Sequence, residues 1–254
     1  MTETTTSPIT SKLVEFLNCP CQYFAPMQDD DPLMAAFHAA QKRGKQEGFI
    51  PMLVAAEDDI LLETLLMNSD PQSKGGTFSP QAVSAYRSAM KALPLSQNVE
   101  ALFPNPWGED DFQNTVNAEE DLEGDEGEPI NRFLGYWDYG TKKTIPLILA
   151  EIPVQQPWEV FAYLPFGGWN ECPDTERLMA TAKYWFTKHG AVPSVVTHDI
   201  LEFTLPQAVG REKAPVLAQE QYAWCADIVD QGVGSITALA QGLADSTVWY
   251  FWWD

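Results

Sequence analysis

The chain has few basic residues and no long apolar run. It contains 15 Lys and Arg against 36 Asp and Glu in 254 residues, so its formal net charge at pH 7 is −21. Repulsion by phosphate argues against binding to nucleic acid or to an anionic lipid surface. The longest apolar runs, such as residues 247–253, are well short of the ~20 residues that span a bilayer. We therefore expect no nucleic-acid or membrane partner, and a preference for cationic partners.

Cysteine is also scarce. The four cysteines, Cys19, Cys21, Cys172 and Cys225, lack the paired CxxC spacing of a zinc site. Cys19 and Cys21 are one proline apart, which is poor geometry for a mutual disulfide. Residues 1–10 lack the basic start and apolar core of a signal peptide. We expect free thiols in a reducing cytoplasm, and neither a metal nor a cofactor.

The acidic residues are concentrated in one segment. Residues 109–128 hold ten acidic residues and no Lys or Arg, whereas residues 1–108 hold twelve acids and seven bases, and residues 129–254 fourteen and eight. We interpret 109–128 as an acidic linker or loop between an N-terminal α/β region and a C-terminal domain, two parts that could pack as one globule. Alternatively, it is an arm that attracts a cationic partner through Glu119, Glu120 and Asp121. Its spacing does not match a calcium-binding loop.

The apolar pattern changes repeatedly between the strand period and the helix period. It predicts strands at residues 49–55, 145–154, 158–164, 191–197, 200–205 and 249–253. It predicts helices at residues 32–46, 174–189 and 212–230. The second and third strands would form a hairpin. Strands that alternate with helices indicate an α/β fold, with α+β possible: a mixed sheet flanked by helices, ending in an aromatic C-terminal strand.

The C-terminal strand contains five consecutive large aromatic residues. Because a strand alternates sides, Trp249, Phe251 and Trp253 face one side, and Tyr250 and Trp252 face the other. If helices cover both faces, all five belong to the core. If one face is uncovered, Tyr250 and Trp252 form an exposed anchor of the kind that dominates interfaces.

A glycine turn and a histidine cluster are candidate sites. Gly167 and Gly168 precede Trp169 and Asn170, and the turn could present backbone N–H groups to an anion or simply join two elements. His198, Asp199 and Glu202 could act as an acid/base cluster. However, Asp199 and Glu202 would point to opposite faces of an extended strand. The alternative interpretation makes Asp199 a turn former and Glu202 an outward, solvated residue.

Three carboxylates lie at helical spacing within the predicted helix 212–230. Glu220, Asp227 and Asp230 would share one helix face. That face could hold a divalent cation or bind a basic partner, or it could simply be solvated.

Several motifs of the second half resemble a known pattern. They are residues 168–173, Tyr184-Trp185, Gly190-Ala191, Asp199 with Glu202, residues 218–222, residues 225–227, residues 230–232 and the terminal residues 249–254. Together they resemble a bacterial family, the domain of unknown function 4253, over roughly the last 110 residues. The terminal Phe-Trp-Trp-Asp is the most specific part, and Ala226 departs from a position that is often proline. The resemblance implies a domain fold and no established activity.

Three functions remain open. The sequence has no nucleophile elbow, P-loop, HExxH motif or dinucleotide-binding glycine pattern. Our leading hypothesis is a non-enzymatic, immunity-type protein that neutralises a cationic, nuclease-like bacterial toxin by direct binding. An enzyme with a carboxylate or metal site around Asp199, Glu202, Glu220 and Asp227 is the first alternative, and a structural or regulatory adaptor is the second. The oligomeric state stays open.

Overall fold

The structure, a computed structural model, describes residues 7–104 and 127–254. Most of the acidic segment 109–128, including the binding candidates Glu119, Glu120 and Asp121, therefore lies outside the described residues. The α-helices are α1 (Pro8–Leu17), α2 (Asp31–Glu47), α3 (Asp59–Ser69), α4 (Pro80–Lys91), α5 (Val99–Leu102), α7 (Thr175–His189), α8 (Ala214–Trp224) and α9 (Ile236–Asp245). A 3₁₀-helix η1 (Pro157–Ala162) and a π-helical turn η2 (Ile228–Val233) complete the helical elements of these ranges.

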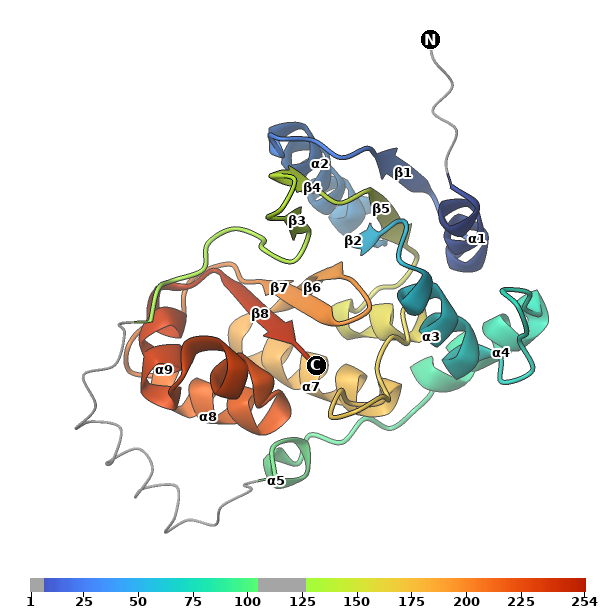
Figure 1. The fold of residues 1–254 in the computed structure, drawn as a ribbon. Helices are drawn as coiled ribbons and strands as arrows, with labels where there is room; N and C mark the ends of the chain where they lie inside the picture. The colour runs from blue at the N-terminus through green and yellow to red at the C-terminus, as the bar shows by residue number, and fades with distance from the viewer. Residues whose placement is uncertain (1–6, 105–126) are drawn as a thin grey trace.

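One six-stranded sheet forms the centre of the molecule (Figure 1). Its strands are β1 (Cys21–Phe24), β2 (Ile50–Ala55), β5 (Leu147–Ile152), β6 (Val192–Val196), β7 (Ile200–Thr204) and β8 (Val248–Trp252), and a separate ribbon pairs β3 (Trp137–Asp138) with β4 (Lys143–Thr144). The order is β1-β5-β2-β6-β7-β8, in which β2 and β6 run parallel and all other neighbours are antiparallel. This confirms the predicted α/β fold with a mixed sheet and an aromatic C-terminal strand.

The sheet joins the two described parts of the chain. β2 comes from the N-terminal part, yet it lies between β5 and β6, which both follow residue 127. Its run of Met52, Leu53 and Val54 is fully buried, as expected for a central strand covered on both faces. The N-terminal region therefore completes the same sheet as the C-terminal one.

Helices cover the two faces of the sheet unequally. On one face, Val54 and Ile148 belong to a large core that includes residues of α1, α3, α7 and α8. On the other face, Leu53 and Leu149 belong to a smaller core with residues of α2 and of the segment 133–136. Figure 1 shows α2 on one side of the sheet and α7, α8 and α9 on the other.

The aromatic C-terminal strand alternates sides as predicted. Trp249, Phe251 and Trp253 are buried in the large core, where Trp185 of α7 stacks on Phe251 with ring centroids 5.4 Å apart. Tyr250 and Trp252 are half-buried on the opposite face. The second face of β8 is thus partly covered, a state between the two that the sequence left open.

Two predicted elements were wrong. Residues 158–164 were expected as the second strand of a hairpin but form η1, because Pro157 occupies the first helical turn and the Glu159 carboxylate accepts a hydrogen bond from Gln156 N at 3.1 Å. The predicted helix 212–230 is interrupted. α8 ends at Trp224, where Cys225 adopts an extended φ of −150° and its thiol donates to the carbonyl of Trp252 at 3.0 Å.

Candidate functional site

The carboxyl ends of β2 and β6 bring an aspartate and a histidine together. The parallel register pairs Leu53 with Val195 and Val54 with Val196, so the residues that follow the two strands lie at the same edge of the sheet. Asp58 follows β2, and its Oδ2 is 2.8 Å from His198 Nδ1 and accepts a hydrogen bond from His198 N at 2.9 Å. Such edges are where open α/β sheets bind ligands.

The position of Asp58 is held by the helix that it starts. Its second oxygen, Oδ1, accepts a hydrogen bond from Leu61 N at 2.9 Å and caps α3. One carboxylate therefore satisfies both a helix terminus and the backbone and ring of His198. The sequence analysis missed Asp58 as a site residue, because 140 positions separate it from His198. A strand followed by an aspartate N-cap, beside a parallel strand, was the signal that could have found it.

Asp199 lies on the other side of the His198 ring. Its Oδ1 is 3.6 Å from His198 Nε2 and accepts a hydrogen bond from Thr197 Oγ1 at 2.7 Å. Its Oδ2 accepts a hydrogen bond from Trp252 Nε1 at 3.0 Å. The His198 side chain is 38% exposed, against 12% for Asp58 and 23% for Asp199. The imidazole is thus solvent-accessible between two partly buried carboxylates, an arrangement that can donate, accept or carry a proton.

The terminal residues connect this cluster to two loops. Trp253 N donates to the carbonyl of Asp199 at 3.1 Å, and Asp254 N donates to Asp227 Oδ2 at 3.0 Å. Asn170 Nδ2 donates to the carbonyl of Asp254 at 2.8 Å, which places the glycine turn at the same edge. We call Asp58, Asp199, Asp227 and Asp254 the acidic edge.

In the described ranges the acidic edge has His198 between Asp58 and Asp199 but no Lys or Arg partner. Within residues 7–104 and 127–254, Arg43 is the only Lys or Arg in an ion pair, and it bonds Glu47 and Glu151 far from this edge. Neutral groups also donate hydrogen bonds to the edge. Gln231 Nε2, for example, donates to Asp227 Oδ1 at 3.0 Å. Asp230, the next candidate along the chain, is exposed and accepts a hydrogen bond from Tyr222 OH at 3.1 Å. No Lys or Arg side chain of the described ranges neutralises these carboxylates.

The interpretation of Glu202 as an outward, solvated strand residue was wrong. It is 0% exposed and accepts hydrogen bonds from Leu134 N at 2.8 Å and Gly135 N at 3.2 Å, because the segment around Phe133 covers this face of β7. Burial raises its pKa from 4.5 to about 7, although the two backbone hydrogen bonds lower it in part. Burial and the negative charges of Glu202 and Asp199 raise the pKa of neighbouring Tyr250. Glu202 therefore fastens a loop to the sheet rather than facing water.

Glu220 does not share a face with Asp227 and Asp230, which is a second correction. α8 ends before both aspartates, and Glu220 is buried between α8 and α7. Its Oε1 accepts a hydrogen bond from Tyr184 OH at 2.6 Å and its Oε2 one from Trp185 Nε1 at 3.1 Å. Both oxygens are therefore committed to the aromatic core.

Of the four residues of the predicted carboxylate or metal site, Asp199 and Asp227 lie at the acidic edge, whereas Glu202 and Glu220 are buried elsewhere. Asp199, Glu202, Glu220 and Asp227 have separate hydrogen-bond partners. Of the described residues, only Asp29, Asp30 and Asp31 bring three metal-ligating side chains within 4.8 Å of one another. Exposed acidic triplets of this kind are common without an ion, and the three lie at the start of α2, away from the acidic edge.

These features define an α/β protein with a mixed six-stranded sheet and an acidic, histidine-containing edge. In a comparison with protein families, residues 148–254 match the family described as Domain of unknown function (DUF4253), which confirms the resemblance over this segment. The match contains His198, Asp199, Asp227 and the aromatic strand, whereas Asp58 lies outside it. No curated protein and no solved structure matches the chain. The helices of the described ranges include none of the length and hydrophobicity needed to cross a membrane.

Proposed function

We propose that the protein is a non-enzymatic binding protein of the immunity type, whose acidic edge contacts a basic protein such as a nuclease-like toxin. The observation that carries the proposal is the convergence of Asp58, Asp199, Asp227 and Asp254 on one edge without a Lys or Arg ion pair in the described ranges. Carboxylates without a Lys or Arg partner can accept charge-assisted hydrogen bonds from lysine or arginine side chains of another molecule.

The surroundings of the edge also favour recognition. Asp199 is oriented by Thr197 and Trp252, so little side-chain freedom remains to be lost when a partner binds. Trp252 is half-buried beside these carboxylates and offers aromatic surface to an incoming guanidinium. The overall charge of −21 would speed the encounter with a cationic partner.

The thiols near this edge support binding over nucleophilic catalysis. Burial raises the pKa of the Cys225 thiol to about 12, and burial also raises the pKa of Cys172. Both side chains are therefore protonated at neutral pH and are poor nucleophiles. An immunity-type protein needs no such group, because it acts by occupying its target.

The experiment measures binding to purified basic proteins encoded by neighbouring genes. Calorimetry would compare the unmodified chain with Asp199→Asn and Asp227→Asn, and with Asp245→Asn as a control for the loss of an exposed charge elsewhere. We expect each edge variant to weaken binding by roughly tenfold and the control to leave it unchanged. Equal affinities for all four proteins, or no binding of any basic neighbour, would contradict the proposal.

A second candidate function rests on the contact between His198 Nδ1 and Asp58 Oδ2 at 2.8 Å. A carboxylate that orients an accessible imidazole is the usual arrangement of a general base, here with Nε2, 3.6 Å from Asp199 Oδ1, as the nitrogen that would take a proton from water or substrate. This enzyme would use Asp58 and His198 in place of the four-carboxylate group predicted from the sequence. A hydrolytic activity lost in both His198→Gln and Asp58→Asn, with the fold intact by circular dichroism, would favour it. The adaptor hypothesis stays a further alternative.

A further inference from the structure

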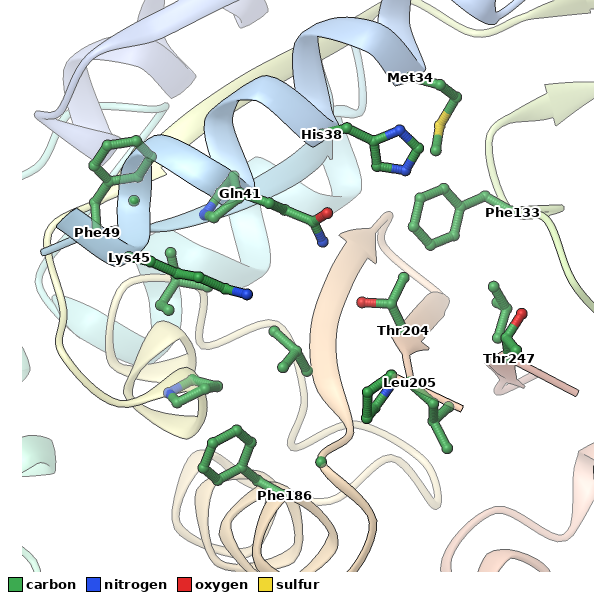
Figure 2. A pocket seen from close by; sticks show the side chains of 18 of the residues that line it. Met34, His38, Gln41, Lys45, Phe49, Phe133, Phe186, Thr204, Leu205 and Thr247 are labelled. Carbon is green, nitrogen blue, oxygen red and sulfur yellow. The ribbon is translucent and has the colours of Figure 1, made fainter. Parts of the chain in front are cut away.

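A large cavity lies between α2 and the less covered face of the sheet, near the amino ends of β2, β6 and β8 (Figure 2). Its volume of about 920 Å³ lies within the range of small-molecule binding sites, which is roughly 300–1,000 Å³. The acidic edge is at the opposite ends of the same strands, so the cavity is separate from the site described above.

The cavity walls are largely apolar and aromatic. Phe49, Phe133, Leu205 and Val248 line it and are buried, and Phe186 lines it from the end of α7. These side chains come from five different parts of the chain, which a ligand would contact together. Such walls suit an organic molecule with an apolar body.

The opposite wall is a row of side chains from α2. Met34, His38, Gln41 and Lys45 recur at spacings of three and four residues, which places them on one helix face. Figure 2 shows His38, Gln41 and Lys45 reaching from α2 toward the cavity, with Thr204 and Leu205 across from them. The helix therefore adds hydrogen-bonding groups and one ammonium to a largely apolar space.

The charge of the lining is opposite to that of the protein. Asp30 is the only acidic residue of the lining, and its Oδ2 accepts a hydrogen bond from Tyr136 OH at 2.6 Å. Lys45 and Arg132 also line the cavity, and neither forms an ion pair within the described ranges. Arg43, which precedes Gly44 of the lining but does not line the cavity itself, forms ion pairs with Glu47 and Glu151. Both side chains are exposed at the rim of the cavity, so they give its mouth a positive charge.

A buried donor of the lining also lacks an acceptor. The indole Nε1 of Trp137 is buried and has no hydrogen-bond partner in the described part of the chain. Leaving such a group unpaired costs about 1–3 kcal/mol, but the buried indole nitrogens of Trp224, Trp249 and Trp253 also lack partners, so this feature is not particular to the cavity. The two cations of the lining favour a ligand that carries an anionic oxygen.

We propose that this cavity binds a hydrophobic carboxylate, with its apolar body against Phe133, Phe186 and Val248 and its negative group toward Lys45. The apolar walls supply affinity by burial, and the ammonium selects an anion over a neutral or cationic molecule of the same shape. The proposal does not depend on the binding of a basic protein at the acidic edge.

The test titrates the full chain with decanoate, decan-1-ol and decyltrimethylammonium by calorimetry. We expect saturable binding of decanoate, weaker binding of the alcohol and none of the cation. Lys45→Gln should weaken decanoate binding by roughly three- to tenfold and leave the alcohol unchanged. Lys42→Gln removes an exposed lysine of the same helix that does not line the cavity, and it should change neither affinity.

A second variant tests the location. Gln41→Trp would fill the cavity from α2 and should abolish the binding of both decanoate and decan-1-ol, whereas Ala39→Trp, on the exposed side of α2, should not. Thermal denaturation of all variants would verify that they fold. Absence of saturable decanoate binding, equal effects of Lys45→Gln and Lys42→Gln, or unchanged binding in Gln41→Trp would each overturn the proposal.

Discussion

Substitution of Glu202 by glutamine should change how stability depends on pH. The carboxyl group is 0% exposed, and burial raises its pKa from 4.5 to about 7. Between these two values the folded state binds a proton that the unfolded state has lost. The free energy of unfolding that the raised pKa of Glu202 contributes is therefore fully present below pH 4.5. It falls as the pH rises to about 7 and is constant at higher pH.

The size of this effect follows from the pKa difference. At about 1.4 kcal/mol for each pKa unit, the rise from 4.5 to about 7 corresponds to about 3 kcal/mol. Glu202→Gln is neutral at every pH and keeps an oxygen for one of the two N–H groups of residues 134 and 135. Between pH 4.5 and pH 8, the free energy of unfolding of the unmodified chain should thus fall by about 3 kcal/mol relative to that of the variant.

Urea denaturation of both proteins, followed at half-unit steps of pH, measures this difference directly. Taking the difference removes the contributions of the other carboxyl groups, which are common to both chains. Glu212→Gln, a change at an exposed residue, is the control and should follow the unmodified chain at every pH. A difference between the unmodified chain and Glu202→Gln that does not vary with pH would refute the reasoning, because Glu202 would then titrate at the same pH in the folded and unfolded states.

Two further predictions concern the groups that position the site. Asp58→Ala removes the N-cap of α3 and the partner of His198, so it should lower the free energy of unfolding by about 1–2 kcal/mol. The control, Asp59→Ala, changes the exposed first residue of the same helix and should alter the free energy of unfolding by less than about 0.5 kcal/mol. Gly135→Ala would place a Cβ 2.6 Å from Ile200 Cγ2, and the overpacking should cost about 1–3 kcal/mol in the same denaturation assay. Stabilities equal to that of the unmodified chain would contradict each of these predictions.

The sequence predicted the features that depend on local pattern. Residues 174–189 were expected as a helix, and α7 spans Thr175–His189 with an Asp174 N-cap and a left-handed Gly190 at its end. The alternation of Trp249 and Tyr250 across the last strand was also predicted, because strand periodicity is a property of the backbone itself. Signals of this kind need no knowledge of distant segments.

The features that failed depend on contacts between distant segments. Glu202 has the sequence pattern of a solvated strand residue, and only the backbone of residues 134 and 135, 68 and 67 positions away, makes it a buried acceptor. Asp58 meets His198 because two parallel strands end side by side, which no local pattern records. The helix predicted through Cys225 stops at Trp224, and the extended Cys225 brings its thiol to the carbonyl of Trp252, a contact with the distant last strand.

The most direct test of the proposed function is the association rate between the full chain and a basic protein encoded beside it, measured from 50 to 300 mM NaCl. If the acidic edge attracts the partner, the rate should fall steeply with salt, and Asp199→Asn combined with Asp227→Asn should reduce both the rate and its dependence on salt. The Asp245→Asn control should retain both. An association rate that is independent of salt, or identical in the double variant, would contradict the account.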